Sequence, residues 1–100
     1  MSRLPIPINK KKIDACCKKH HITYLALFGS ILTSHFSASS DVDILVKFDK
    51  NHTPGLFGFF DIQDELSEIL GREVDLKTPN SLSRYFRNTV LSTAQVLHGK

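Results

Sequence analysis

The residues of this chain whose types and spacing could do chemistry begin in the stretch GSILTSHFSASSDVD, residues 29–43. It ends on two aspartates, Asp41 and Asp43, that flank a valine. Side chains two residues apart in a strand point to the same face, so we expect both carboxylates to project together, with Cα atoms roughly 7 Å apart. Like charges at that spacing repel unless a cation lies between them, and hard oxygen ligands select Mg²⁺ or Mn²⁺.

A third carboxylate, Asp75, lies in the strand-like segment REVDLK, residues 72–77. In a strand, Val74 and Leu76 face one way and Asp75 faces the other. If this segment pairs with DVDILVKF, all three carboxylates meet over one patch of the sheet. Such a set could hold two metal ions about 4 Å apart, which is the arrangement that clamps the attacking and leaving oxygens of a phosphoryl transfer.

Gly29 and Ser30 supply a site for the phosphates. They follow an apolar strand-like run and precede a short helical piece, so free backbone N–H groups favour an anion there. Glycine lets a phosphate approach the backbone closely, and the Ser30 hydroxyl can donate to a phosphate oxygen. A triphosphate would place its tail on this turn and its α-phosphate at the metal ions.

The elements that must position these residues alternate between helix and strand. The predicted helices are a first one capped by Asn9, one or two turns in ILTSHF, LFGFFDIQDELSEIL ended by Gly71, and TPNSLSRYFRNTVLSTAQVL as far as Leu97. The predicted strands are HITYLALFG, DVDILVKF and REVDLK. This order predicts an α/β (α+β) fold, a small mixed β-sheet flanked by about four helices.

Length and charge narrow the class of protein. One hundred residues, 41% of them hydrophobic, predict a single domain over residues 1–100 with one packed core. The basic residues gather in an N-terminal helix segment, residues 1–21, of net charge +5, while the other 79 residues carry −2. We therefore expect a solvated basic face and no nucleic-acid partner. With no bilayer-spanning run and no signal peptide, we expect a cytoplasmic protein without a membrane partner.

The cysteines and histidines carry no chemistry by their spacing. Cys16 and Cys17 are adjacent, which disfavours a disulfide between them, and no second cysteine pair exists for a zinc site. We expect both to be small apolar residues in a reducing compartment. The five histidines are scattered without metal-ligand spacing and stay unassigned.

Three segments together resemble a known family. LFGS, then SDVDILVKF after a ten-residue gap, then EVDLKTPNSLSRYFRNTVL closely resemble the minimal nucleotidyltransferases (MNT) of the DNA polymerase beta-like superfamily, from Tyr24 onwards. The resemblance implies a nucleotidyltransferase fold with residues 22–100 as its catalytic core. It also implies that many relatives are antitoxins encoded beside a HEPN-domain toxin, which they silence by binding it and transferring AMP to a tyrosine.

The resemblance assigns roles to the residues singled out above. Gly29 and Ser30 are implied to bind the nucleotide, and Asp41, Asp43 and Asp75 are implied to be catalytic and to ligate two Mg²⁺ or Mn²⁺ ions, with Asp75 as the base for the incoming hydroxyl. The expected activity is transfer of a nucleoside monophosphate, AMP from ATP, to a hydroxyl of a HEPN partner.

This sequence departs from the family pattern within the turn itself. Family members commonly read GSRARG where this chain reads GSILTS, so Ile31 and Thr33 replace arginines and Ser34 replaces a glycine. Losing those charges should weaken triphosphate capture and transfer, while the three acids are intact.

Two alternative functions stay open. One is a binding module that neutralises its partner only by covering it; the other is transfer to a small-molecule alcohol. A run of apolar residues at a helix start, LFGFF (residues 56–60), favours an oligomer or toxin-binding surface. Near the acids, we expect Lys77 to pair with Glu73.

Overall fold

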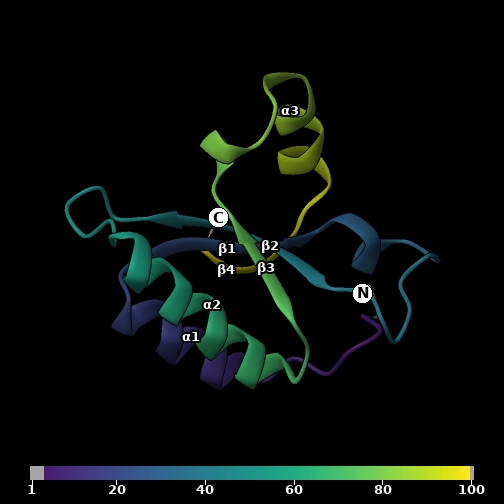
Figure 1. Cartoon of the computed structure of the whole chain (residues 1–100), viewed down its shortest axis with the longest axis horizontal. Helices are drawn as coiled ribbons and strands as arrows, with labels where there is room; N and C mark the ends of the chain where they lie inside the picture. The colour runs from purple at the N-terminus through teal and green to yellow at the C-terminus, as the bar shows by residue number, and fades with distance from the viewer. Residues whose placement is uncertain (1–3, 100) are drawn as a thin grey trace.

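The chain, a computed structural model that describes residues 4–99, is built on one four-stranded sheet of order β3-β2-β1-β4 (Figure 1). Residues 1–3, with the Arg3 of the basic segment, and Lys100 lie outside the described part. The strands are β1 (Ile22–Phe28), β2 (Val42–Phe48), β3 (Val74–Lys77) and β4 (Gln95–Gly99). The helices are α1 (Lys10–Lys19), α2 (Leu56–Leu70) and α3 (Arg84–Thr93), with short 3₁₀ helices η1 (Gly29–Leu32) and η2 (Pro79–Ser81).

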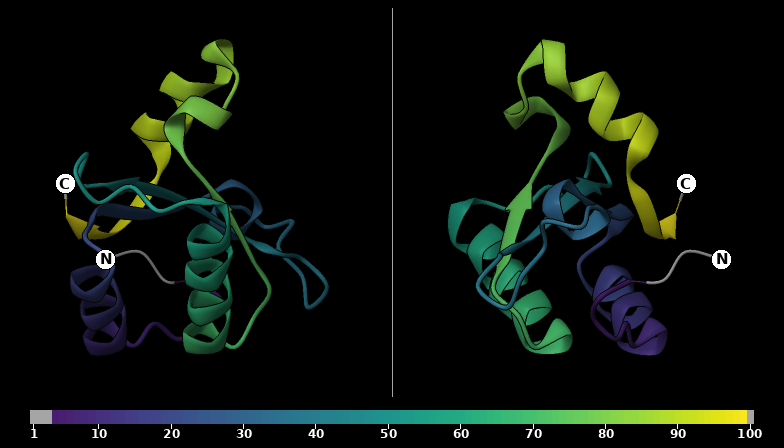
Figure 2. Two further views of the ribbon diagram at one scale, coloured as in Figure 1. Left: turned by 60° about the vertical axis from the view of Figure 1, so that its left-hand side comes forward. Right: turned by 90° about the vertical axis from the view of Figure 1, so that its right-hand side faces the viewer.

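The helices form a layer on each side of this sheet. Helices α1 and α2 lie side by side under one face, and α3 covers part of the other (Figures 1 and 2). Alternation along the strands divides the core accordingly: Val42, Ile44 and Val46 belong to the cluster under α1 and α2, whereas Leu45 belongs to the cluster under α3. The two faces of one strand therefore serve two separate cores.

Helix α1 begins and helix α2 ends at the capping residues that the sequence predicts. The Asn9 side chain accepts a hydrogen bond from the Lys12 N–H at the start of α1, which satisfies a donor that the helix itself leaves unpaired. At the end of α2, Gly71 adopts the left-handed conformation with φ +68°. Both predicted boundaries are confirmed.

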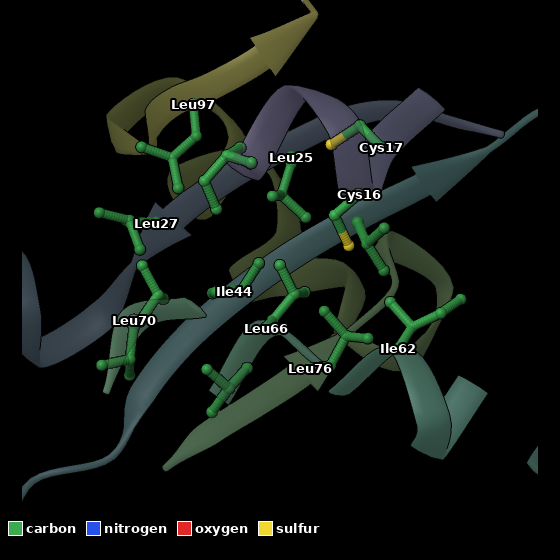
Figure 3. Packing of buried hydrophobic residues seen from close by; sticks show 14 of the residues in the cluster. Cys16, Cys17, Leu25, Leu27, Ile44, Ile62, Leu66, Leu70, Leu76 and Leu97 are labelled. Atoms are coloured by element: carbon green, nitrogen blue, oxygen red, sulfur yellow. The ribbon is translucent and has the colours of Figure 1, made fainter. Parts of the chain in front are cut away.

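Both cysteines are free and buried, as expected, and help to pack α1 onto the sheet. Their sulfur atoms point in different directions among the core side chains (Figure 3). Burial raises the pKa of each thiol to about 12, so neither is a ready nucleophile at neutral pH.

The predicted last helix is wrong at its C-terminal end. Helix α3 stops at Thr93, Ala94 is extended, and Gln95–Gly99 pairs antiparallel with the free edge of β1 as a fourth strand. Consequently Val90 lies in the core under α3, while Leu97 lies in the core under α1 and α2. The apolar spacing fitted a helix, but the backbone of residues 95–99 pairs instead with the edge of β1 that would otherwise be left unpaired.

The predicted fold class is confirmed, with a small difference in helix number. Residues 4–99 hold three α-helices and two short 3₁₀ helices in place of about four helices. The sheet is mixed, since β2 runs parallel to β3 and antiparallel to β1. None of the helices within residues 4–99 combines the length and hydropathy needed to cross a membrane.

Candidate functional site

Two of the three predicted carboxylates lie next to each other on neighbouring strands. The parallel register of β2 and β3 makes Asp43 the Cα partner of Asp75, so both side chains leave the same face of the sheet. Strand β2 begins at Val42, which leaves Asp41 exposed just before the strand. The condition under which the sequence predicted one shared patch, that β3 pairs with β2, is met.

Asp43 is a partly buried carboxylate with two other acids nearby. Partial burial raises the pKa of the Asp43 carboxyl above its usual value, and the negative charges of Asp75 and Asp41 raise it further, against an opposing effect of Lys77. When Asp43 is ionised, the positive charge of Lys77 nearby is therefore not enough to compensate for burial and for the two neighbouring acids. Three carboxylates of which one is partly desolvated are a donor set that fits a hard divalent cation.

Gly29 lies directly against the Asp43 carboxylate. A Cβ added at Gly29 would collide with Asp43 Oδ2, and the glycine has φ +78°, a conformation that other residues adopt only with strain. Gly29 opens η1 at the end of β1, where Phe28 is the antiparallel partner of Asp43. The absence of a side chain at position 29 therefore makes room for the Asp43 carboxylate itself, which lies where a Cβ would be.

The turn that follows Gly29 is held in place from both ends. Ile31 is buried in the core under α1 and α2, where it anchors η1 to the sheet. The Thr33 hydroxyl and N–H both donate to the Ser30 carbonyl, at 2.8 and 2.9 Å. Position 31 therefore packs inward, and the turn contributes backbone donors and the Ser30 hydroxyl rather than cationic side chains.

A cavity of about 450 Å³ opens beside this turn, between η1 and α3. Its walls include Gly29 and Thr33 from the turn and Phe86, Thr89 and Thr93 from α3. The rest of its lining is apolar and none of its residues is charged, so the cavity offers open volume beside Gly29 without a cation.

Lys77 pairs with a different acid from the one that the sequence indicated. Its Nζ lies 3.2 Å from Asp75 Oδ2, and the expected pair with Glu73 is not the contact found. Lys77 and Asp75 are two apart on β3 and share a face, so the pair forms at no cost in backbone geometry. One cation is therefore present among the carboxylates.

Arg72 is a residue of this site that sequence reasoning missed. Its Nη2 donates to the carbonyls of Ser37, Ala38 and Ser40, and its guanidinium lies 4.6 Å above the Phe36 ring. These contacts fold the loop that leads into Asp41. No spacing in the sequence signals them, because Arg72 lies more than 30 residues away from its partners.

Apolar side chains are exposed at the start of α2. Leu56, Phe57 and Phe60 are exposed there, Phe57 by 83%. Phe59 differs, because it is partly buried and its ring lies edge-on against Phe48 at 6.4 Å. The exposed part of the LFGFF run is therefore smaller than the sequence indicated.

Comparison with known proteins agrees with this architecture. A family model described as "Polymerase beta, Nucleotidyltransferase" matches residues 11–100. A protein of Methanocaldococcus jannaschii, provisionally named protein adenylyltransferase MJ0435, is 34% identical over 85 residues, which cover 85% of this chain and 89% of that protein.

Two solved structures share the fold at lower identity. One is a toxin-antitoxin with AMP-PNP, with a TM-score of 0.72 and 24% identity, over 93% of this chain and 75% of that one. The other is a tri-AMPylated Shewanella oneidensis HEPN toxin in complex with MNT antitoxin, with a TM-score of 0.64 and 24% identity, over 91% and 70% of the two chains.

Proposed function

The chain belongs to the polymerase beta nucleotidyltransferase family, and on this premise we propose that it moves AMP from ATP to a hydroxyl group of a HEPN-domain toxin, acting as its antitoxin. The acceptor in this proposal is a tyrosine of the toxin. We place the reaction in the cytoplasm, where two unpaired cysteines such as Cys16 and Cys17 stay reduced.

The observation that carries this proposal is the position of Gly29 against Asp43, with Asp75 next to Asp43 in register. A nucleotide whose tail contacts the Gly29–Ser30 turn reaches the carboxylates within the length of a triphosphate. Phosphoryl transfer from a nucleotide requires this combination, in which an anion-binding turn lies against a carboxylate of the metal-binding group.

In the proposed reaction each residue has one task. The Ser30 hydroxyl and the backbone N–H groups of the turn donate hydrogen bonds to the terminal phosphates. These hydrogen bonds hold the α-phosphate beside Asp43. Asp75 accepts the proton of the incoming hydroxyl. The freed oxygen forms a bond to the α-phosphorus, the bond to the β-phosphate oxygen breaks, and pyrophosphate leaves.

Asp41, Asp43 and Asp75 are the residues that would hold Mg²⁺ or Mn²⁺, which when bound supplies positive charge to the phosphate oxygens. The raised pKa of Asp43 supports this assignment, because the carboxylate gains most from a cation. Arg72 supports it from outside, since the loop it folds ends at Asp41.

The proposed HEPN partner is supported by the names of similar proteins and not by a particular surface of this chain. The Methanocaldococcus relative is provisionally named a protein adenylyltransferase, and one structural neighbour is an MNT antitoxin complex with an AMPylated HEPN toxin. Nucleotide choice is supported in the same way by the neighbour that contains AMP-PNP.

The deciding experiment is transfer of label from [α-³²P]ATP to a HEPN-domain toxin, with Mg²⁺ present. We expect labelling by the wild type and none by the double variant Asp41→Asn, Asp43→Asn. The matched control is Asp61→Asn with Asp64→Asn, which removes the same charge from exposed positions on α2. Labelling that persists in the first double variant would refute the proposed site.

A second candidate function is neutralisation by binding alone. The buried Ile31 favours it, because the turn presents no cation at that position, and so do the exposed Phe57 and Leu56. In that case the double variant Asp41→Asn, Asp43→Asn would protect cells from the toxin as well as the wild type does.

A further inference from the structure

A second group of ligand atoms lies on the far side of the sheet from the carboxylates. Cys16 and His20 are four apart on and just after α1, and Glu65 reaches them from α2. The Cys16 sulfur, a His20 ring nitrogen and a Glu65 oxygen all lie within 4.8 Å of one another. Within residues 4–99 they are the one group of three metal-ligating side chains gathered this closely.

The side chains of this group contact one another directly, so an ion that binds here replaces the hydrogen bond between His20 and Glu65. Glu65 Oε1 lies 2.9 Å from His20 Nε2, while Glu65 Oε2 is occupied by Lys19 Nζ at 2.8 Å. The carboxylate is thus oriented by Lys19, and its other oxygen faces the imidazole and the thiol. An outer partner that fixes a ligating carboxylate is a regular feature of protein metal sites.

Solvent reaches the group. A cavity of about 300 Å³ opens at this point of the surface, with Cys16, Lys19 and Glu65 in its wall. Cys16 itself is buried, and His20 and Glu65 are about a quarter exposed. An ion can therefore enter from the cavity and meet the thiol at its inner end.

We propose that Cys16 Sγ, His20 Nε2 and Glu65 Oε1 bind a zinc ion, with water as the fourth ligand, and that the ion joins α1 to α2. The thiol proton is released to solvent as the zinc–sulfur bond forms. One sulfur, one nitrogen and one oxygen ligand suit Zn²⁺ and disfavour Mg²⁺, which avoids sulfur.

The charges balance in the bound state. A thiolate and a carboxylate neutralise the divalent ion, and the imidazole binds in its neutral form. Lys19 keeps its pair with the second carboxylate oxygen. The site belongs to the α1–α2 layer, whereas the aspartates lie on the face that α3 partly covers (Figure 2).

Cobalt(II) is the probe for this site, because it takes the place of zinc and reports its ligands by colour. The metal-free chain carrying Asp41→Asn and Asp43→Asn is titrated with Co²⁺, so that the carboxylate site does not compete. We expect one equivalent to produce a sulfur-to-cobalt charge-transfer band and the intense visible bands of a four-coordinate ion, and Zn²⁺ to displace it.

Adjacent residues supply the controls. Cys17→Ser should keep the charge-transfer band, and Cys16→Ser should lose it, although both side chains are buried. His20→Gln should weaken zinc binding by roughly tenfold or more, whereas His52→Gln, at an exposed histidine, should not.

The proposal is overturned if the chain that carries only Asp41→Asn and Asp43→Asn shows no sulfur-to-cobalt band. An equal band in the Cys16→Ser variant overturns it as well. If that variant does not fold, His20→Gln decides, because His20 is partly exposed and an unchanged zinc affinity in this variant also overturns the site.

Discussion

Asp43 on β2 faces Asp75 on β3 in parallel register, and the Asp43 carboxylate also lies against the bare Cα of Gly29. One side chain thus lies against the turn and beside the second carboxylate, the two parts of the proposed site.

The first prediction is that Asp43→Asn stabilises the metal-free protein. Because burial and the nearby Asp75 raise the pKa of Asp43 in the folded state, the folded protein binds a proton more tightly there than the unfolded chain does. Ionising Asp43 therefore costs stability as the pH rises through its folded pKa. Urea unfolding in EDTA should show the variant more stable than the wild type at pH 7, and the difference should vanish below the unfolded pKa, near 3.8. A variant less stable at pH 7 would contradict the assigned electrostatics.

The second prediction concerns Gly29→Ala. The new methyl group meets the Asp43 carboxylate, and the positive φ adds strain of about 1–2 kcal/mol. We expect lower stability and a large loss of Mg-ATP affinity by calorimetry. Gly71→Ala is the matched control, since Gly71 also has positive φ but an added Cβ there meets nothing within 4 Å. It should cost the same backbone strain of about 1–2 kcal/mol and leave nucleotide binding unchanged.

The third prediction is that Arg72→Ala loosens the loop before Asp41. Removing the guanidinium takes one donor from each of three carbonyls, of which Ser37 O keeps the Ser40 N–H, and takes the cation from the Phe36 ring. Amide exchange over residues 37–41 should rise, and Mg-ATP should bind roughly tenfold more weakly, about 1.4 kcal/mol. Arg84→Ala, at an exposed arginine on α3, should change neither quantity. Unaltered exchange in the loop would show that Arg72 does not position it.

The fourth prediction concerns the exposed apolar residues of α2. Phe57→Asp should weaken the complex with the toxin in a pull-down while leaving the thermal midpoint near that of the wild type, because Phe57 is 83% exposed. Phe59→Asp should instead lower the midpoint, since Phe59 packs against Phe48. Tyr85→Asp, at 90% exposure on α3, tests whether the effect is confined to α2. An intact complex in the Phe57 variant would place the partner elsewhere.

The fifth prediction is a loss of stability in acid that depends on Glu65. Burial acts to raise the pKa of Glu65, but hydrogen bonds from Lys19 and His20 outweigh it and lower the pKa from 4.5 to about 2. The stabilisation is therefore present above pH 4.5 and is lost as the pH falls towards 2. Glu65→Gln should be less stable than the wild type by about 1 kcal/mol at pH 7 in EDTA, and equal to it near pH 2. Glu68→Gln, exposed on the same helix, should show no such dependence.

Much of the fold could be predicted because its signals act over a few residues. The Asn9 cap and the left-handed Gly71 each satisfy groups within one helical turn, so residue type alone indicates where α1 begins and α2 ends. Alternation in DVDILVKF likewise places Asp43 on the face opposite Val42 and Ile44. The candidate carboxylates could be selected in this way, although their roles remain proposals.

One failed prediction is local, since Lys77 pairs with Asp75 and not with Glu73. The other features that the sequence did not indicate concern contacts between residues far apart in the chain. Leu97 follows helical spacing, yet its segment pairs with β1 because β1 has a free edge about 70 residues earlier. Arg72 and its loop carbonyls, and Glu65 with Cys16 and His20, are brought together by elements that do not neighbour one another in sequence.

The sequence by itself therefore determined all the main elements before residue 94, the faces of their side chains and the three acids, because those depend on backbone periods and end signals. Only the tertiary structure decided that Asp43 lies against Gly29, that β4 completes the sheet and that a thiol, an imidazole and a carboxylate meet between α1 and α2. Such meetings depend on which sheet edges and helix faces remain to be covered, and that is a property of the whole folded chain.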